Sequence, residues 1–183
     1  MNESTRNEIL ALYSPERIEH VLGVEEEAVR LARRWGAEAD AARFSALLHD
    51  CTKEWDTERH LKFIKQYNII ASKADIPKLL HGISGAALAR VRFGAVDEIC
   101  AAVRWHTSGR PDMSVLEKIV YLADKIEPSR DCDGELRRLS YQDIDRAMLA
   151  VMDCGLIKLL REGRHIHPDT LDARNYYLAK VNA

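Results

Sequence analysis

The sequence lacks the features that mark membrane, secreted or nucleic-acid-binding proteins. No run of about 18 apolar residues occurs in its 183 residues, so no membrane-spanning helix is expected. The first eight residues contain no apolar signal region, and we therefore expect a cytoplasmic protein. The net charge of −2 provides no global attraction to nucleic acid or to a membrane surface. An anionic ligand would therefore have to be held by a local cluster of cations.

Cysteine pairs, repeats and strand patterns are also missing. The four cysteines form no CxxC pair, and in the cytoplasm they are predicted to be free thiols; they are Cys51, Cys100, Cys132 and Cys154. The sequence contains no internal repeat, low-complexity tract or linker, and its length predicts one domain over residues 1–183, with a core at about 14–178. Apolar residues recur at helical spacing from end to end. The expected fold is an all-α bundle.

Capping signals divide the first half of the chain into helices. A short helix is predicted over residues 3–12 and a longer one from Pro15 to Trp35, stopped by Gly36. The next helix is expected to be capped by Asp40 and to carry His49. Asp56 is expected to cap a helix over 57–67 that turns Leu61 and Ile64 inward.

The second half continues the same pattern after a break at residues 73–77. Pro77 is predicted to begin a short turn that delivers His81, followed by a helix to about residue 93. Asp97 should cap a helix over 98–106, and Ser114 a helix over 115–126, with Glu117 completing a capping box. A long helix is expected from residue 140 to about 162, and the last from 168 to about 177.

Five segments place a metal-ligand side chain at or near the end of an apolar run: they carry His20, the adjacent pair His49 and Asp50, His81, His106 and Asp124. A lone histidine on an apolar face is more often a hydrogen-bonded core residue than a ligand. Several such groups buried in one small domain would cost several kcal/mol unless they were paired or coordinated. A shared metal site removes that cost for all of them together.

The motifs around these residues resemble those of the bacterial YqeK-type HD-domain family. The order His…His-Asp…His…His…Asp is that of the HD phosphohydrolase superfamily. The more specific segments are His106-Thr107-Ser108-Gly109 and Ala123-Asp124-Lys125-Ile126-Glu127-Pro128-x-Arg130. An opening Arg17-x-Glu19-His20-Val21-x-Gly23-Val24 and a closing Pro168-Asp169-Thr170-x-x-Ala173-x-Asn175 match as well, so the resemblance covers about residues 8–178. Departures at Cys51-Thr52, Ser108 and Lys125 leave the substrate preference open.

The resemblance implies a centre of two divalent metal ions. On that basis we assign His20, His49, Asp50 and Asp124 to one ion, and His81, His106 and the second oxygen of Asp50 to the other. Asp50 can bridge because a carboxylate has two oxygens. Imidazole and carboxylate ligands suit iron, manganese, cobalt or zinc, and the family resemblance favours iron.

The resemblance also implies an activity, the hydrolysis of diadenosine tetraphosphate into two ADP. This dinucleoside polyphosphate is polyanionic, so Lys53 and Arg130 are expected to serve catalysis with Asp50, and Lys125 to bind phosphate. Thr107 and Gly109 are expected to line the mouth of the same site. The substrate is also expected to reach the ligands of the second ion, His81 and His106.

Other interpretations remain open at this stage. The chain could be another HD enzyme, such as a nucleotidase or a cyclic nucleotide phosphodiesterase, or a non-catalytic nucleotide sensor whose metal only staples the bundle. A complete set of six ligands argues against the sensor. The sequence predicts no nucleic-acid or membrane partner and does not decide whether the chain forms a homodimer. Surface positions are expected for His60, His165 and His167, a helix start for Asp169 and Thr170, and Asn175 has no decided role.

Overall fold

The structure, a computed structural model, describes residues 1–69, 76–130 and 134–183. Every regular element in these ranges is a helix, which confirms the predicted all-α class. No helix in the described ranges is long and apolar enough to cross a membrane. The elements are α1 (Glu3–Leu10), α2 (Pro15–Trp35), α3 (Ala39–Leu48), α4 (Thr57–Gln66), the short 3-10 turn η1 (Pro77–Leu79), α5 (Leu80–Phe93), α6 (Asp97–Trp105), α7 (Val115–Ile126), α8 (Gly134–Gln142), α9 (Ile144–Arg161) and α10 (Pro168–Val181).

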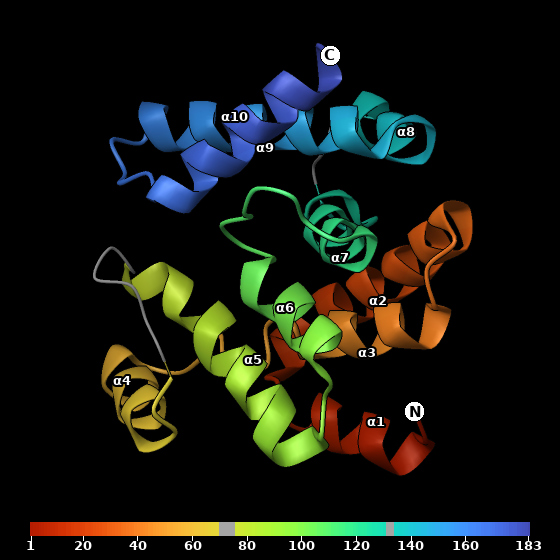
Figure 1. The fold of residues 1–183 in the computed structure, drawn as a ribbon. Coiled ribbons are helices and arrows are strands. Elements are labelled where there is room, and N and C mark those ends of the chain that lie inside the picture. Colours follow the sequence, from red (N-terminus) through yellow and green to blue (C-terminus); the bar gives the residue numbers. More distant parts are fainter. Residues whose placement is uncertain (70–75, 131–133) are drawn as a thin grey trace.

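The helices are arranged around α7, which lies between two groups of helices (Figure 1). On one side α7 contacts α2, α3 and α6, and on the other it contacts α8 and α9. Helix α10 covers α9, α5 packs on α6, and α4 packs on the outer side of α5. Almost every side chain of α7 is buried, as expected for a helix that is surrounded by other helices.

Local sequence signals explain the bounds of the two helices that matter most for the site. Pro15 occupies the first turn of α2, and Gly36 ends this helix in the left-handed conformation at φ +71°. In α7, the Ser114 side chain accepts a hydrogen bond from the backbone of Glu117, whose carboxylate accepts one from the backbone of Ser114. This predicted capping box is present, and it fixes the start of the helix that carries Asp124.

Several predicted helix boundaries are wrong. Two caps are displaced by one or two residues, and one predicted long helix starts later than expected because another helix precedes it. The caps of α3 and α6 are Glu38 and Val96, so that the expected caps Asp40 and Asp97 lie inside the first turn. Residue 140 does not open a long helix, because α8 already runs through it and Asp143 caps α9 by accepting from the backbone of Arg146. The hydroxyl of Ser140 instead donates to the Leu136 carbonyl, a bond typical of a helix interior.

Helix α4 turns a different face inward from the predicted one. Ile64 is buried as expected, but Leu61 is 52% exposed and His60 is only 3% exposed. His60 and Ile64 are four residues apart and share one face of the helix. The prediction that His60 faces solvent is therefore wrong, because the face containing His60 is the one that packs against α5.

The cysteine and histidine predictions for the rest of the chain are mostly confirmed. Cys51, Cys100 and Cys154 are free thiols, whereas Cys132 lies outside the described residues, as do residues 73–75 of the predicted break. His165 is exposed. His167 is buried, contrary to the prediction, because it caps α10 through a bond from the backbone of Asp169 to its ring.

A close approach of α5 and α6 yields a test of the packing. A Cβ atom at Gly82 would lie 2.7 Å from the backbone oxygen of Arg104, so Gly82→Ala should separate the two helices and lower the free energy of unfolding by about 1–3 kcal/mol. Gly155 lies inside α9 with no neighbour within 4 Å. Gly155→Ala should instead raise stability by about 1 kcal/mol through helix propensity. Urea unfolding measures both, and a stability of Gly82→Ala equal to that of the wild type would contradict the packing.

Candidate metal centre

Helix ends bring most of the predicted ligands together. His49 and Asp50 directly follow α3, His106 directly follows α6, and His81 is the second residue of α5. His20 comes from the first half of α2 and Asp124 from the last turn of α7. The histidine and aspartate side chains on these five helices converge on one centre.

Asp50 is the shared member of two compact ligand groups. One group is His20, His49 and Asp50, and the other is Asp50, His81 and His106; within each group the ligand atoms lie within 4.8 Å of one another. Oδ1 of Asp50 is 3.2 Å from Nε2 of His81 and 3.3 Å from Nε2 of His106. Nε2 of His49 lies 3.6 Å from Oδ2 of Asp50. The two oxygens of one carboxylate thus face two different sets of imidazoles.

Asp124 lies beside the first of these groups. Its Oδ1 atom is 3.2 Å from Nε2 of His20 and 3.9 Å from Nε2 of His49. Asp124 is not a member of either compact group, but it lies next to the group of His20, His49 and Asp50. The division into four ligands on one side and three on the other stays a prediction.

Hydrogen bonds to Nδ1 fix the orientation of three imidazoles. Nδ1 of His49 donates to the Ala46 carbonyl at 2.6 Å, and Nδ1 of His106 donates to the Val103 carbonyl at 2.7 Å. Nδ1 of His20 donates to Oε1 of Glu127 at 3.0 Å. A proton on Nδ1 leaves the lone pair on Nε2, which points into the centre. This arrangement, in which the outer nitrogen bonds a carbonyl or carboxylate, is typical of metal-bound histidine.

The electrostatics favour the protonation states that bind metal. Burial lowers the pKa of His49 and of His106, and it lowers the pKa of His81 to about 4. Burial alone would raise the pKa of Asp50, but the surrounding histidines hold that pKa well below its usual value. At neutral pH, His49, His81 and His106 are therefore neutral and Asp50 is ionised, which are the forms that coordinate a cation.

Two unpaired polar atoms show that these residues fit a metal ion. Nε2 of His49 and Oδ1 of Asp50 are buried and have no hydrogen-bond partner among the residues that the structure describes. Buried polar atoms without partners are rare because each costs about 1–3 kcal/mol. A cation held by the two ligand groups would satisfy both atoms.

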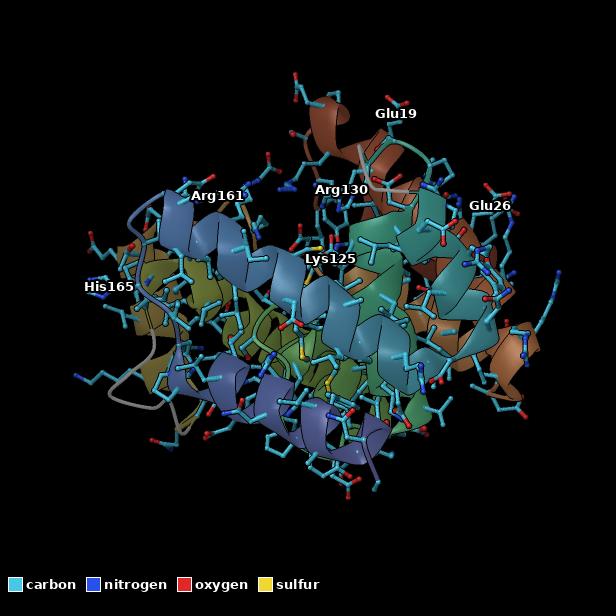
Figure 2. The ribbon with its side chains drawn as sticks, turned by 90° about the horizontal axis from the view of Figure 1, so that it is seen from above. Glu19, Glu26, Lys125, Arg130, Arg161 and His165 are labelled. Carbon is cyan, nitrogen blue, oxygen red and sulfur yellow. The ribbon has the colours of Figure 1, made fainter. Side chains whose placement is uncertain are left out.

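Four cations surround the two aspartates, three of which were predicted. Lys53 lies 3.6 Å from Oδ1 of Asp50, and its ammonium donates to Nε2 of His81 at 3.0 Å. Lys125 donates to Oδ2 of Asp124, and Arg130 donates to Oδ1 of Asp124 at 2.8 Å. Lys125 and Arg130 share the partner Asp124, and they are labelled near each other in Figure 2.

The fourth cation, Arg17, was missed by the sequence prediction. Its guanidinium is 3.2 Å from Oδ2 of Asp50. Arg17 precedes His20 by three residues and so lies on the same face of α2. That spacing was a usable signal.

Glu127 is a second residue that the prediction missed. Its side chain is 1% exposed and accepts bonds from His20, from the Ser129 backbone and from the Ser129 hydroxyl. A Cβ atom at Gly23 would lie 2.7 Å from Oε2 of Glu127. Glycine at this position of α2 therefore leaves room for the carboxylate that orients His20.

The two remaining predicted site residues, Thr107 and Gly109, differ in their positions. Thr107 joins the centre, since its hydroxyl is 3.0 Å from Nε2 of His81 and 2.9 Å from Nε2 of His106. Gly109 is buried with φ +70°, and a Cβ atom there would meet Met152 and Ala173. It therefore packs against the protein interior and does not line the mouth of the candidate site.

His165 lies at the outer edge of the molecule (Figure 2). His167, Asp169 and Thr170 form the start of α10, and Asn175 accepts a bond from Arg174.

The convergence of histidines and aspartates on helix ends defines a helical metal-centre protein of the HD type. The chain belongs to the HD-domain family, whose model matches residues 17–129, a range that contains all six candidate ligands. This match confirms the HD-domain resemblance drawn from the motifs.

Two curated relatives make the resemblance more specific. The chain is 35% identical to the symmetrical bis(5'-nucleosyl)-tetraphosphatase of Bacillus subtilis (strain 168), a match that covers 95% of this chain and 98% of the relative. It is 36% identical to the protein of the same name from Halalkalibacterium halodurans, with 94% and 97% covered. These matches agree with the YqeK-type family suggested by the motifs.

A solved structure matches nearly the whole chain. It is described as a predicted HD superfamily hydrolase involved in NAD metabolism from Clostridium acetobutylicum. The TM-score is 0.92 at 33% identity, and 98% of each chain is covered. The family fold therefore extends over α8, α9 and α10, which lie beyond the range of the HD-domain model.

Removing the shared carboxylate tests the geometry of the centre. Asp50→Ala should abolish binding at both ligand groups, because each group loses an anionic ligand. Elemental analysis after loading with a divalent metal measures the stoichiometry. The matched control is His165→Ala, which removes an exposed histidine far from the centre and should bind as much metal as the wild type. Full metal content in Asp50→Ala would refute the shared role of this residue.

Proposed function

We propose that this protein is a metal-dependent hydrolase that cleaves diadenosine tetraphosphate symmetrically into two ADP. The observation that carries the proposal is the pair of ligand groups joined at Asp50 and surrounded by four cations. The names of the two curated relatives supply the substrate and the symmetry of the cut. The same fold over nearly the whole chain supports one catalytic domain over residues 1–183.

The proposed ligands are the two compact groups together with Asp124. One ion would be held by His20, His49, Asp50 and Asp124, and the second by His81, His106 and the other oxygen of Asp50. Divalent ions at these positions would act as Lewis acids toward a phosphoryl oxygen and lower the pKa of water. Nitrogen and oxygen ligands of this kind are suited to iron, manganese, cobalt or zinc, and we propose iron on the family resemblance.

The charges of the site favour a polyanionic substrate. Asp50, Asp124 and Glu127 together carry three negative charges, whereas Arg17, Lys53, Lys125 and Arg130 carry four positive charges around them. Two bound divalent ions would add four more, which makes the centre strongly positive. Arg130 and Arg17 present guanidinium groups for bidentate phosphate contacts, and Lys53 presents a point charge.

The proposed cations also explain how a central cut is assisted. Attack on the second phosphorus of a four-phosphate chain releases ADP from the other half, and negative charge develops on that leaving group. Lys53 or Arg130 can stabilise this charge by donating hydrogen bonds to it. Thr107, which contacts both His81 and His106, is placed to donate to a phosphate oxygen bound between them.

The products distinguish the proposed reaction from its alternatives. Incubation with diadenosine tetraphosphate and each divalent metal should yield ADP alone, and labelled water should place its oxygen in one of the two ADP molecules. Chromatography with mass detection measures both results. ATP and AMP as the main products would reject the symmetrical cut and retain the hydrolase. Nucleotide binding without turnover under any metal would favour a sensor instead.

Substitution of the cations tests the phosphate contacts. Arg130→Ala and Lys53→Ala should each lose a charge-assisted hydrogen bond to phosphate, about 1.5–3 kcal/mol in kcat/KM, with metal content near normal. Arg161→Ala removes an exposed arginine at the end of α9 and serves as the matched control. Normal kcat/KM in both variants would show that neither cation binds the substrate phosphates.

A further inference from the structure

A buried chain of polar side chains leads from α4 to the backbone of His81. Nδ1 of His60 is 2.7 Å from the Ser84 hydroxyl, which lies 2.9 Å from the Thr52 hydroxyl. The Thr52 hydroxyl in turn donates to the backbone carbonyl of His81 at 3.0 Å. All four residues are 3% exposed or less. The three contacts join α4, the segment between α3 and α4, and α5, and they end on a candidate metal ligand.

The direction of each hydrogen bond in this series of side chains follows from the number of protons available. Thr52 has one hydroxyl proton, and that proton goes to the His81 carbonyl. The Ser84 hydroxyl has one proton, and both the Leu80 carbonyl at 3.0 Å and the Thr52 hydroxyl at 2.9 Å lie within its reach. With that proton directed to either oxygen, Ser84 accepts from a proton on Nδ1 of His60. Ser84 therefore links His60 both to the first turn of α5, through Leu80, and to Thr52, which donates to His81.

The support that His81 receives differs from that of the other histidines in the centre. Nδ1 bonds orient His20, His49 and His106. Within the described residues, His81 makes its contacts through Nε2 and through its backbone carbonyl. His81 also belongs to the first turn of α5, where the helix has only just begun. The position of its backbone therefore depends on the Thr52 bond and on what holds Thr52.

We propose that His60 is a positioning residue for the second metal ion: acting through Ser84 and Thr52, it holds the start of α5 so that His81 meets His106 and Asp50. The proposal rests on the two-metal centre proposed above. His60 is separated from the centre by two intervening side chains and touches neither substrate nor metal. Its ring packs beside Trp55, with centroids 5.7 Å apart, so α4 acts as a brace on the outer side of α5.

The proposal predicts a selective loss. His60→Ala should weaken binding of the second metal equivalent by about tenfold to a hundredfold, the range found for residues that support metal ligands. The first equivalent, on the His20 side, should bind as in the wild type. Calorimetric titration of the metal-free protein with manganese measures the two equivalents separately. Leu61→Ala, at the exposed neighbouring position of the same helix, is the matched control and should bind both.

Conservative variants separate the hydrogen bond from simple packing. The amide of His60→Asn can reach the position of Nδ1, so this variant should recover most of the second affinity, while His60→Leu should not. Thr52→Ser should retain the affinity and Thr52→Val should lose it. Wild-type affinity for both equivalents in His60→Ala or His60→Leu, with only a lower Tm, would overturn the proposal. So would failure of His60→Asn to bind better than His60→Leu.

A spectroscopic measurement keeps this test distinct from that of the proposed function. In the metal-free protein, nitrogen–proton correlation spectra report the tautomer of His81. His60→Leu should change the His81 signals, whereas Leu61→Ala should not. Unchanged signals in His60→Leu would overturn the positioning role. Binding of one metal equivalent or none by the wild type would reject the two-metal centre and, with it, the selective effect proposed for His60.

Discussion

The burial of Asp50 is the constraint on which the rest of the site depends. Its side chain is 4% exposed, and an ionised carboxylate can be buried to this degree only when charge or hydrogen bonds compensate it. Its two oxygens face different imidazole groups, while Arg17 and Lys53 approach from the rim. A divalent cation held by the imidazoles and this carboxylate would provide the compensation that the protein atoms alone leave incomplete.

Helix ends supply the geometry that this constraint requires. The last carbonyl groups of a helix have no partner within the helix, and the structure uses this feature twice. His49 after α3 and His106 after α6 each donate from Nδ1 to the carbonyl three residues earlier. The same bond gives one of the last carbonyls of the helix a side-chain partner, selects the tautomer and directs Nε2 inward. Placing a histidine directly after a buried helix therefore produces an oriented ligand without further support.

The sequence indicated the candidate ligands because polar residues at the ends of apolar runs are conspicuous. It also revealed caps whose side chains bond the backbone, such as Asp56 and Ser114. Contacts between distant segments are not written directly in the sequence, although the three-residue spacing of Arg17 and His20 places both on one face of α2. Arg17 meets Asp50 across 33 residues, Glu127 meets His20 across 107, and His60 meets Ser84 across 24. In α4, with few apolar residues, tertiary packing selected the buried face.

The two halves of the centre are supported by different physical means, and this difference bears on where the substrate enters. The carboxylate of Glu127 orients His20, and an anionic partner makes an imidazole a stronger ligand. On the other half, neutral hydroxyls hold the backbone of His81, and the proposed second ion has three protein ligands. Fewer protein ligands leave more coordination positions for water and phosphate. Thr107 and Lys53 contact His81 on this half, whereas Arg17, Lys125 and Arg130 contact the two aspartates on the side of His20. We infer that the α5–α6 half would keep positions open for water and a phosphate oxygen, while cations on the other half would hold the rest of the polyphosphate.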